Sequence, residues 1–146
     1  MAKELRTEIE IDAPPERVWR VLTDFASFPE WNPFMPNLHG EAKVGSKLEV
    51  EMRPPGGRAM TFRPTVLAAT PNRELRWLGR VGLPGVFDGE HRFAIEALDG
   101  NRSRFVQSER FTGALVLPIM LMIEKSTLRG FEEMNAALKG RAEAGG

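Results

Sequence analysis

Apolar and charged side chains alternate near the start of the chain. Residues 4–12 place charged groups on one face and put the following residues on the other: Leu5, Thr7, Ile9 and Ile11. A period of two is typical of a strand with one buried face. We therefore expect the chain to begin with a half-buried strand.

Two short helices are predicted to follow this strand. Asp12 or Ala13 opens the first helix, because Pro14 and Pro15 are acceptable in a first turn, where backbone N–H groups need no partner. Residues 27–30 (Ser-Phe-Pro-Glu) resemble a capping box for the second helix. That helix is expected to end at Asn32, because the residue before a proline disfavours the helical conformation.

After Pro36 the alternation returns and predicts six strands. The clearest are residues 60–69 and 74–81 and a hairpin of 88–98 with 103–111 around a loop at 99–101. Pro64 lies inside the first of these stretches. Because proline cannot donate to a sheet, residues 60–69 are expected to be an edge or bulged strand.

From about Leu117 the apolar positions recur at spacings of one, three and four. This pattern predicts one continuous helix of ~20 residues, roughly 30 Å long. Residues 142–146 are expected to be a disordered tail. A large antiparallel sheet with one long amphipathic helix is expected to curl around that helix, so the prediction is a single α+β domain over residues 1–146.

The composition excludes several classes of function. The 146 residues include twenty basic and twenty acidic side chains, which argues against a nucleic-acid-binding surface. No cysteine is present, so a disulfide, a thiol nucleophile or a thiolate metal site is excluded. His39 is the only histidine besides His91, so no metal or other cofactor is expected. The N-terminal residues lack an apolar signal core and no run is long enough for a transmembrane segment, which favours the cytoplasm.

Five stretches carry a family resemblance: residues 11–19, 28–34, 90–93 and 109–113, and Phe131 with 135–139. In these the chain resembles the START-like, birch-pollen-allergen-type SRPBCC superfamily, nearest its polyketide cyclase/dehydrase branch. The resemblance spans nearly the whole chain and implies a helix-grip fold, with a curved seven-stranded antiparallel sheet around the C-terminal helix. That fold hosts carriers, cyclases, receptors and co-chaperone activators, so the resemblance leaves the activity open.

The direction of the predicted strands places four loops at one end of the domain: 32–36, 54–59, 82–87 and 112–117. Their tips carry large apolar side chains, which include Phe34, Met35 and Phe87. Apolar loop tips are unusual on a monomer. They either pack together as a lid over an ordinary core or form a ring around a ligand entrance.

The inner face of the predicted sheet is mostly apolar, with three polar exceptions. If Phe93 and Phe105 point inward, so do His91, Gln107 and Glu109. A three-residue loop at 99–101 sets His91 opposite Glu109 and Gln107 opposite Phe93, with the first pair about 5 Å apart. The pair could orient a ligand or shuttle a proton, or it could be a satisfied buried ion pair. No nucleophile or second base accompanies it.

Helix residues on the predicted inward stripe complete the candidate site. Methionine there suits an adaptable cavity and an irregular filled core equally well. The candidate ligand-binding residues are Phe34, Met35, Trp77, Phe87, His91, Phe93, Gln107, Glu109, Met120, Ile123, Thr127 and Phe131.

From these residues we expect a protein that binds or transports a small to medium hydrophobic molecule, such as a lipid, a polyketide or an isoprenoid-like compound. The first alternative is a cyclase or dehydratase that uses His91 and Glu109 as an acid–base pair. The second is a protein-interaction module. A monomer or weak homodimer is expected.

Overall fold

The structure is a computed structural model that describes residues 2–146, and its first strand follows the alternation of the sequence. Along β1 (Ala2–Ile11), Leu5 and Ile11 are buried while Glu4, Arg6 and Glu8 are exposed. The remaining elements are α1 (Pro15–Thr23), the 3-10 turn η1 (Phe25–Ser27), α2 (Phe28–Trp31), β2 (Asn37–His39), β3 (Glu49–Met52), β4 (Met60–Phe62), β5 (Thr65–Thr70), β6 (Glu74–Val81), β7 (Phe87–Asp99), β8 (Arg102–Thr112) and α3 (Val116–Glu143).

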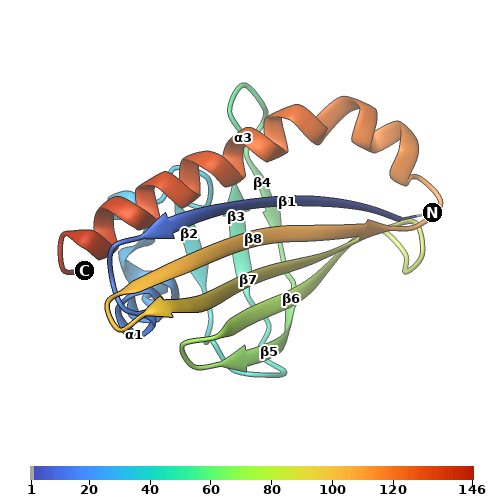
Figure 1. The fold of residues 1–146 in the computed structure, drawn as a ribbon. Helices are drawn as coiled ribbons and strands as arrows, with labels where there is room; N and C mark the ends of the chain where they lie inside the picture. The colour runs from blue at the N-terminus through green and yellow to red at the C-terminus, as the bar shows by residue number, and fades with distance from the viewer. Residues whose placement is uncertain (1) are drawn as a thin grey trace.

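The strands form two hydrogen-bonded antiparallel sheets. One has the order β1-β8-β7-β6-β5, and the other has the order β2-β3-β4. The helix-grip fold is confirmed: α3 lies along the curved sheet, beside β1 and β8, and reaches α1 and α2 with its second half (Figure 1). No helix among residues 2–146 has the length and apolarity needed to cross a bilayer, and the expected cytoplasmic location stays a prediction.

The strand count differs from the predicted seven because the stretch 60–69 is divided. It forms β4 and β5 on either side of Arg63 and Pro64, where proline has no N–H for the ladder. The two sheets still meet there: the N–H of Leu48 donates to the carbonyl of Pro64, and the N–H of Val66 donates to that of Ser46, both at 2.9 Å. The predicted strand is thus divided between the two sheets, with β4 in one and β5 in the other.

The end of α3 differs from the disordered tail expected at 142–146. Ala142 and Glu143 belong to the helix, and Ala142 is fully buried. The corner between β1 and α1 holds this end, because Arg17 donates to the carbonyl of Ala142 (3.1 Å) and the N–H of Asp12 donates to the Glu143 carboxylate (2.8 Å). The helix is therefore longer at its end than the sequence predicts.

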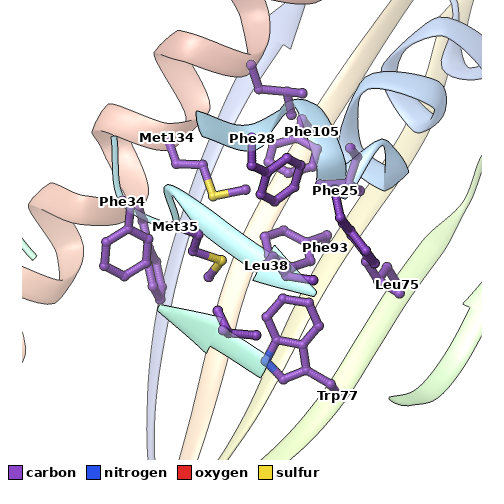
Figure 2. Close-up of a cluster of buried hydrophobic side chains, with 14 of the residues drawn as sticks. Phe25, Phe28, Phe34, Met35, Leu38, Leu75, Trp77, Phe93, Phe105 and Met134 are labelled. Atoms are coloured by element: carbon purple, nitrogen blue, oxygen red, sulfur yellow. The ribbon is translucent and has the colours of Figure 1, made fainter. Parts of the chain in front are cut away.

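The loop 32–36 lies inside the grip and not at the rim, where Phe34 and Met35 were expected. These two side chains are 2% and 0% exposed. Asn32 turns the loop inward, since its Oδ1 accepts hydrogen bonds from the backbone N–H groups of Phe34 (3.1 Å) and Met35 (2.8 Å). Figure 2 shows both residues in the buried cluster between α3 and the sheet.

Gly130 of α3 makes room for Phe34. A Cβ atom at Gly130 would lie 2.5 Å from Cδ1 and Cε1 of the Phe34 ring, and that ring also packs edge-on against Phe131 with centroids 5.8 Å apart. The space beside Gly130, where the helix carries no side chain, is therefore filled by the Phe34 ring.

We expect Gly130→Ala to lower the free energy of unfolding by about 1–3 kcal/mol, because the added methyl group overlaps a buried ring. The matched control is Gly140→Ala in the same helix, where nothing lies within 4 Å of the added atom. That variant should gain about 0.5–1 kcal/mol from helix propensity. In a Phe34→Ala background, Gly130→Ala should become stabilising. Urea unfolding measures all four variants, and a destabilisation that persists without the Phe34 ring would contradict this account.

Candidate ligand-binding site

The inner face of β7 and β8 carries the polar residues that the sequence singled out. The register pairs His91 with Glu109 and Phe93 with Gln107, which confirms the predicted pairing. The Nδ1 atom of His91 lies 3.3 Å from Oε1 of Glu109, and its Nε2 atom lies 2.9 Å from Oε1 of Gln107. One imidazole thus connects an amide and a carboxylate on the same strand.

The polar contacts continue from Gln107 to α3 and β1. Gln107 donates from Nε2 to Oδ1 of Asn135 (2.8 Å) and to the carbonyl of Phe131 (3.5 Å). Asn135 donates from Nδ2 to Oγ1 of Thr7 (2.8 Å), and the Thr7 hydroxyl donates to the backbone carbonyl of Gln107 (3.3 Å). We call this series from Glu109 to Thr7 the polar chain. It joins three strands and the helix.

The direction of every hydrogen bond in the polar chain is determined by its two backbone carbonyls, which can only accept. Since Thr7 donates to one carbonyl, it accepts from Asn135, whose Oδ1 is left to accept from Gln107. The Gln107 Oε1 atom must then accept from Nε2–H of His91. The polar chain thus selects an imidazole that carries a proton on Nε2.

His91 is enclosed by aromatic rings and is fully buried. Its ring centroid lies 5.4 Å from Trp77, 4.6 Å from Phe93 and 5.2 Å from Phe131. The Glu109 side chain, by contrast, is 13% exposed. Glu109 is therefore more accessible than His91, which lies behind it in the core.

Gly89 provides the space for this carboxylate. A Cβ atom at Gly89 would overlap Oε2 of Glu109. Gly89 pairs with Gly79 on β6, so two neighbouring positions on the concave face carry no side chain. The Glu109 carboxylate and Phe111 cover Gly89, and Pro64 lies against Gly79, where an added Cβ atom would be 3.7 Å from the proline Cβ.

The middle of α3 is incompletely covered. Ile123 and Thr127 lie in the middle of the stripe that turns toward the sheet, yet both are only half-buried. On either side the same stripe is buried, at Met120 and at Phe131. Half-buried positions on the sheet and the helix thus define what we call the open end of the grip, which consists of Gly79, Gly89, Glu109, Ile123 and Thr127.

The other candidate residues lie deeper. Met120 and Phe87 are buried near the start of α3 and of β7, and the rest are enclosed in the core: Phe34, Met35, Trp77, Phe93 and Phe131. Two hollows of about 110 and 300 Å³ lie outside the grip, the first beside Trp31 and Arg141 and the second beside Arg73 and Arg92. A ligand inside the grip therefore uses the open end or displaces core side chains.

The predicted entrance is partly as expected. The loops 82–87 and 112–117 do meet, since the N–H groups of Ala114 and Leu115 donate to the carbonyls of Gly85 and Val86 (2.9 and 3.0 Å). The 54–59 loop projects past the middle of α3 instead (Figure 1), and 32–36 is buried. Two of the four loops expected at this end of the domain therefore meet there.

Asn135 is the residue of the polar chain that sequence reasoning missed. It is 3% exposed and follows the buried Met134 on α3. A polar residue next to the apolar stripe, four positions after Phe131, was the available signal. Its partner could not be identified from spacing, because Thr7 lies 128 positions away in the chain.

The perturbed ionisable groups lie away from the polar chain. Hydrogen bonds from Asn37 and Arg53 hold the pKa of Glu51 below its ordinary value. A hydrogen bond to Glu90 raises the pKa of Arg76 on the outer face. The pKa of Glu143 is lowered by Lys139 and by the backbone of Asp12. These groups stabilise strand pairs and the helix end.

Comparison with known proteins gives one family and several similar folds. A protein-family model described as "Polyketide cyclase / dehydrase and lipid transport" matches residues 2–143. No curated protein sequence matches the chain.

Among solved structures, the Zhui aromatase/cyclase from Streptomyces sp. R1128 is 19% identical, with 100% of this chain and 99% of that chain covered and a TM-score of 0.80. A START superfamily protein from Mycobacterium smegmatis is 23% identical, with 97% of each chain covered and a TM-score of 0.76. Norcoclaurine synthase from Thalictrum flavum, in complex with dopamine and hydroxybenzaldehyde, is 13% identical, with 100% and 89% covered and a TM-score of 0.75. At these identities the likeness shows the fold.

We expect Asn135→Leu to lower the free energy of unfolding by about 2–4 kcal/mol, because Gln107 loses an acceptor and Thr7 loses a donor in a buried site. Ala136→Leu is the control, since Ala136 is exposed on the same helix and should change stability by less than about 0.5 kcal/mol. Chemical denaturation measures both variants. Nitrogen-detected NMR of the imidazole should also show faster exchange of the Nε2 proton in Asn135→Leu. Equal stability of the two variants would refute a structural role of the polar chain.

Proposed function

The chain belongs to the polyketide cyclase / dehydrase and lipid transport family, and we propose that it binds a small to medium hydrophobic molecule between α3 and the concave face of the sheet. The observation that carries the proposal is the open end of the grip. There two half-buried glycines of the sheet, a partly exposed carboxylate and two half-buried helix residues adjoin an otherwise sealed apolar core. Lipids, polyketides and isoprenoid-like compounds fit this surface.

The accessible carboxylate narrows the chemistry of the ligand. An ionised Glu109 accepts hydrogen bonds and donates none, so the preferred ligand carries a hydroxyl or another donor near one end. The stacked rings of Phe87 and Phe111, with centroids 5.4 Å apart, lie on the same inner face as this group. A ligand with an apolar body and one hydrogen-bond donor, such as a phenol or a hydroxylated polyketide, would match these two rings and the Glu109 carboxylate.

The energy of such binding is modest. Burying about 300 Å² of apolar ligand surface contributes roughly 7 kcal/mol, and part of this is offset by the cost of association and of ordering side chains. The hydrogen bond to Glu109 must therefore add to the affinity. Phe34 and Met35 set the inner limit of the site, because they fill the far part of the grip.

Catalysis of cyclisation or dehydration is the second candidate. The 3.3 Å contact between Nδ1 of His91 and Oε1 of Glu109 is what favours it. Glu109 would exchange a proton with the substrate. The buried His91 would hold the Glu109 carboxyl group in position and restore its protonation state after each turnover. An interaction module is the third candidate, and it would require neither group.

We expect Ile123→Trp to abolish binding of the apolar fluorophore phenylnaphthylamine, because the larger ring fills the open end. The matched control is Leu121→Trp two residues away, which points outward and should leave the affinity unchanged. Fluorescence titration at fixed protein concentration gives both affinities, and thermal unfolding verifies that the variants fold. If neither the natural protein nor Leu121→Trp takes up the probe, binding in the grip is disproved.

The His91→Gln variant separates a carrier from an enzyme. For a carrier we expect probe affinity to stay as it is, because His91 is buried behind Glu109. The second measurement is turnover of a linear poly-β-ketone that can cyclise to an aromatic ring. Turnover by the natural protein that disappears in His91→Gln, with binding retained, would favour the cyclase reading over ours.

A further inference from the structure

The start of α3 exposes large apolar side chains that the core does not use. Leu121 and Met122 are 89% and 84% exposed, and Leu83 in the neighbouring loop is 75% exposed. Leu115 and Leu117 are about half exposed. Single exposed leucines are ordinary, but a group of five at one end of a domain is characteristic of a docking surface.

These side chains belong to adjoining segments. The backbone hydrogen bonds from Ala114 and Leu115 to Gly85 and Val86 tie the 82–87 loop to the segment that leads into α3. Figure 1 shows that loop beside the start of the helix, at the end of the sheet where β8 finishes. We call the set Leu83, Leu115, Leu117, Leu121 and Met122 the apolar end.

The unpaired charges nearest the apolar end are positive. Residues 81–87 and 112–123 contain no charged side chain. The nearest charges beyond them include two ion pairs, Arg80 with Asp88 (3.6 Å) and Lys3 with Glu124 (2.7 Å). The exposed Arg110 forms no ion pair with the described residues. Within residues 2–146 the next exposed charges on the helix, Lys125 and Arg129, form no ion pair. The unpaired charges of α3 nearest the apolar end are therefore positive, and the exposed carboxylates Glu132 and Glu133 follow farther along the helix.

The exposed residues of α3 form one ridge. Leu117, Leu121, Lys125 and Arg129 follow one another at intervals of four and are all exposed, so they share a face of the helix. Successive members are about 6 Å apart along the axis. The ridge passes from two leucines to two cations, as in helices that lie in a membrane interface with apolar groups below the headgroups and cations beside the phosphates.

We propose that the apolar end docks on the surface of an anionic lipid bilayer, with Leu121 and Met122 inserted at the boundary of the acyl chains and Lys125 and Arg129 against lipid phosphates. A second copy of the chain is a poorer occupant, because it would bring the same two positive charges next to the apolar end, whereas the exposed carboxylates of α3, Glu132 and Glu133, lie farther along the helix. The docking proposal depends only on the apolar end and on Lys125 and Arg129, and not on ligand binding inside the grip. The use of this surface as a route for ligand uptake rests on the proposed function, since Ile123 and Thr127 lie on the opposite side of the same helical turns.

Vesicle co-sedimentation tests the proposal with the full chain. We expect binding to vesicles of phosphatidylcholine mixed with phosphatidylglycerol, weaker binding to phosphatidylcholine alone, and a loss of affinity as salt screens the cations. The double substitution Leu121→Glu with Met122→Glu should weaken binding about tenfold or more. Lys125→Gln and Arg129→Gln should each weaken binding to the anionic vesicles about fivefold. Val44→Glu is the control, since Val44 is exposed outside the patch, and it should bind as the natural protein does.

Two results would overturn the docking surface. One is equal binding of the double Glu variant and the natural protein. The other is no vesicle binding together with a concentration-dependent dimer, in sedimentation equilibrium, that the double Glu variant dissociates. The Ile123→Trp variant separates the two proposals: it should dock on vesicles and take up no probe. A natural protein that docks but never takes up the probe keeps the docking surface and overturns only internal binding.

Discussion

The polar chain from Glu109 to Thr7 is the constraint on which the rest of the structure depends. It links His91 of β7 to two residues of β8, Glu109 and Gln107. From Gln107 it continues to Asn135 of α3 and ends at Thr7 of β1. A buried amide or imidazole without a partner costs more than its hydrogen bond contributes when made. The helix can therefore take only the position along the sheet that pairs Asn135 with Gln107. Apolar packing fills the grip, and the polar chain sets its register.

That register also decides which part of the grip can receive a ligand. One side of the polar chain is sealed by Phe34, which packs on Gly130, and by Phe131, which covers His91. On the other side the side chains thin out to two glycines and a half-exposed stretch of α3. Glu109, the only carboxyl group of the polar chain, lies at this boundary. The chain belongs to a family described as "Polyketide cyclase / dehydrase and lipid transport". In this member, core side chains fill one end of the space between α3 and the sheet.

Much of the site could be predicted because it is local in sequence. The pairing of His91 with Glu109 follows from a hairpin with a short loop, in which the register is set by the turn. The inward stripe of α3 follows from its spacing. The position of Phe34 could not be predicted, because a loop containing two prolines can expose or bury its aromatic residue. The capping role of Asn32 and the absence of a side chain at Gly130 together bury it.

The sequence by itself determined the elements, their order and the polar face of the hairpin, because alternation, helical spacing and turn length act between near neighbours. The tertiary structure decided which side chains fill the grip, that the Glu109 carboxylate is partly exposed and how the hydrogen bonds of the polar chain are directed. Those properties arise between Thr7, Gln107 and Asn135, whose positions in the chain are far apart. Packing and hydrogen-bond satisfaction over such separations are settled only when the helix closes on the sheet.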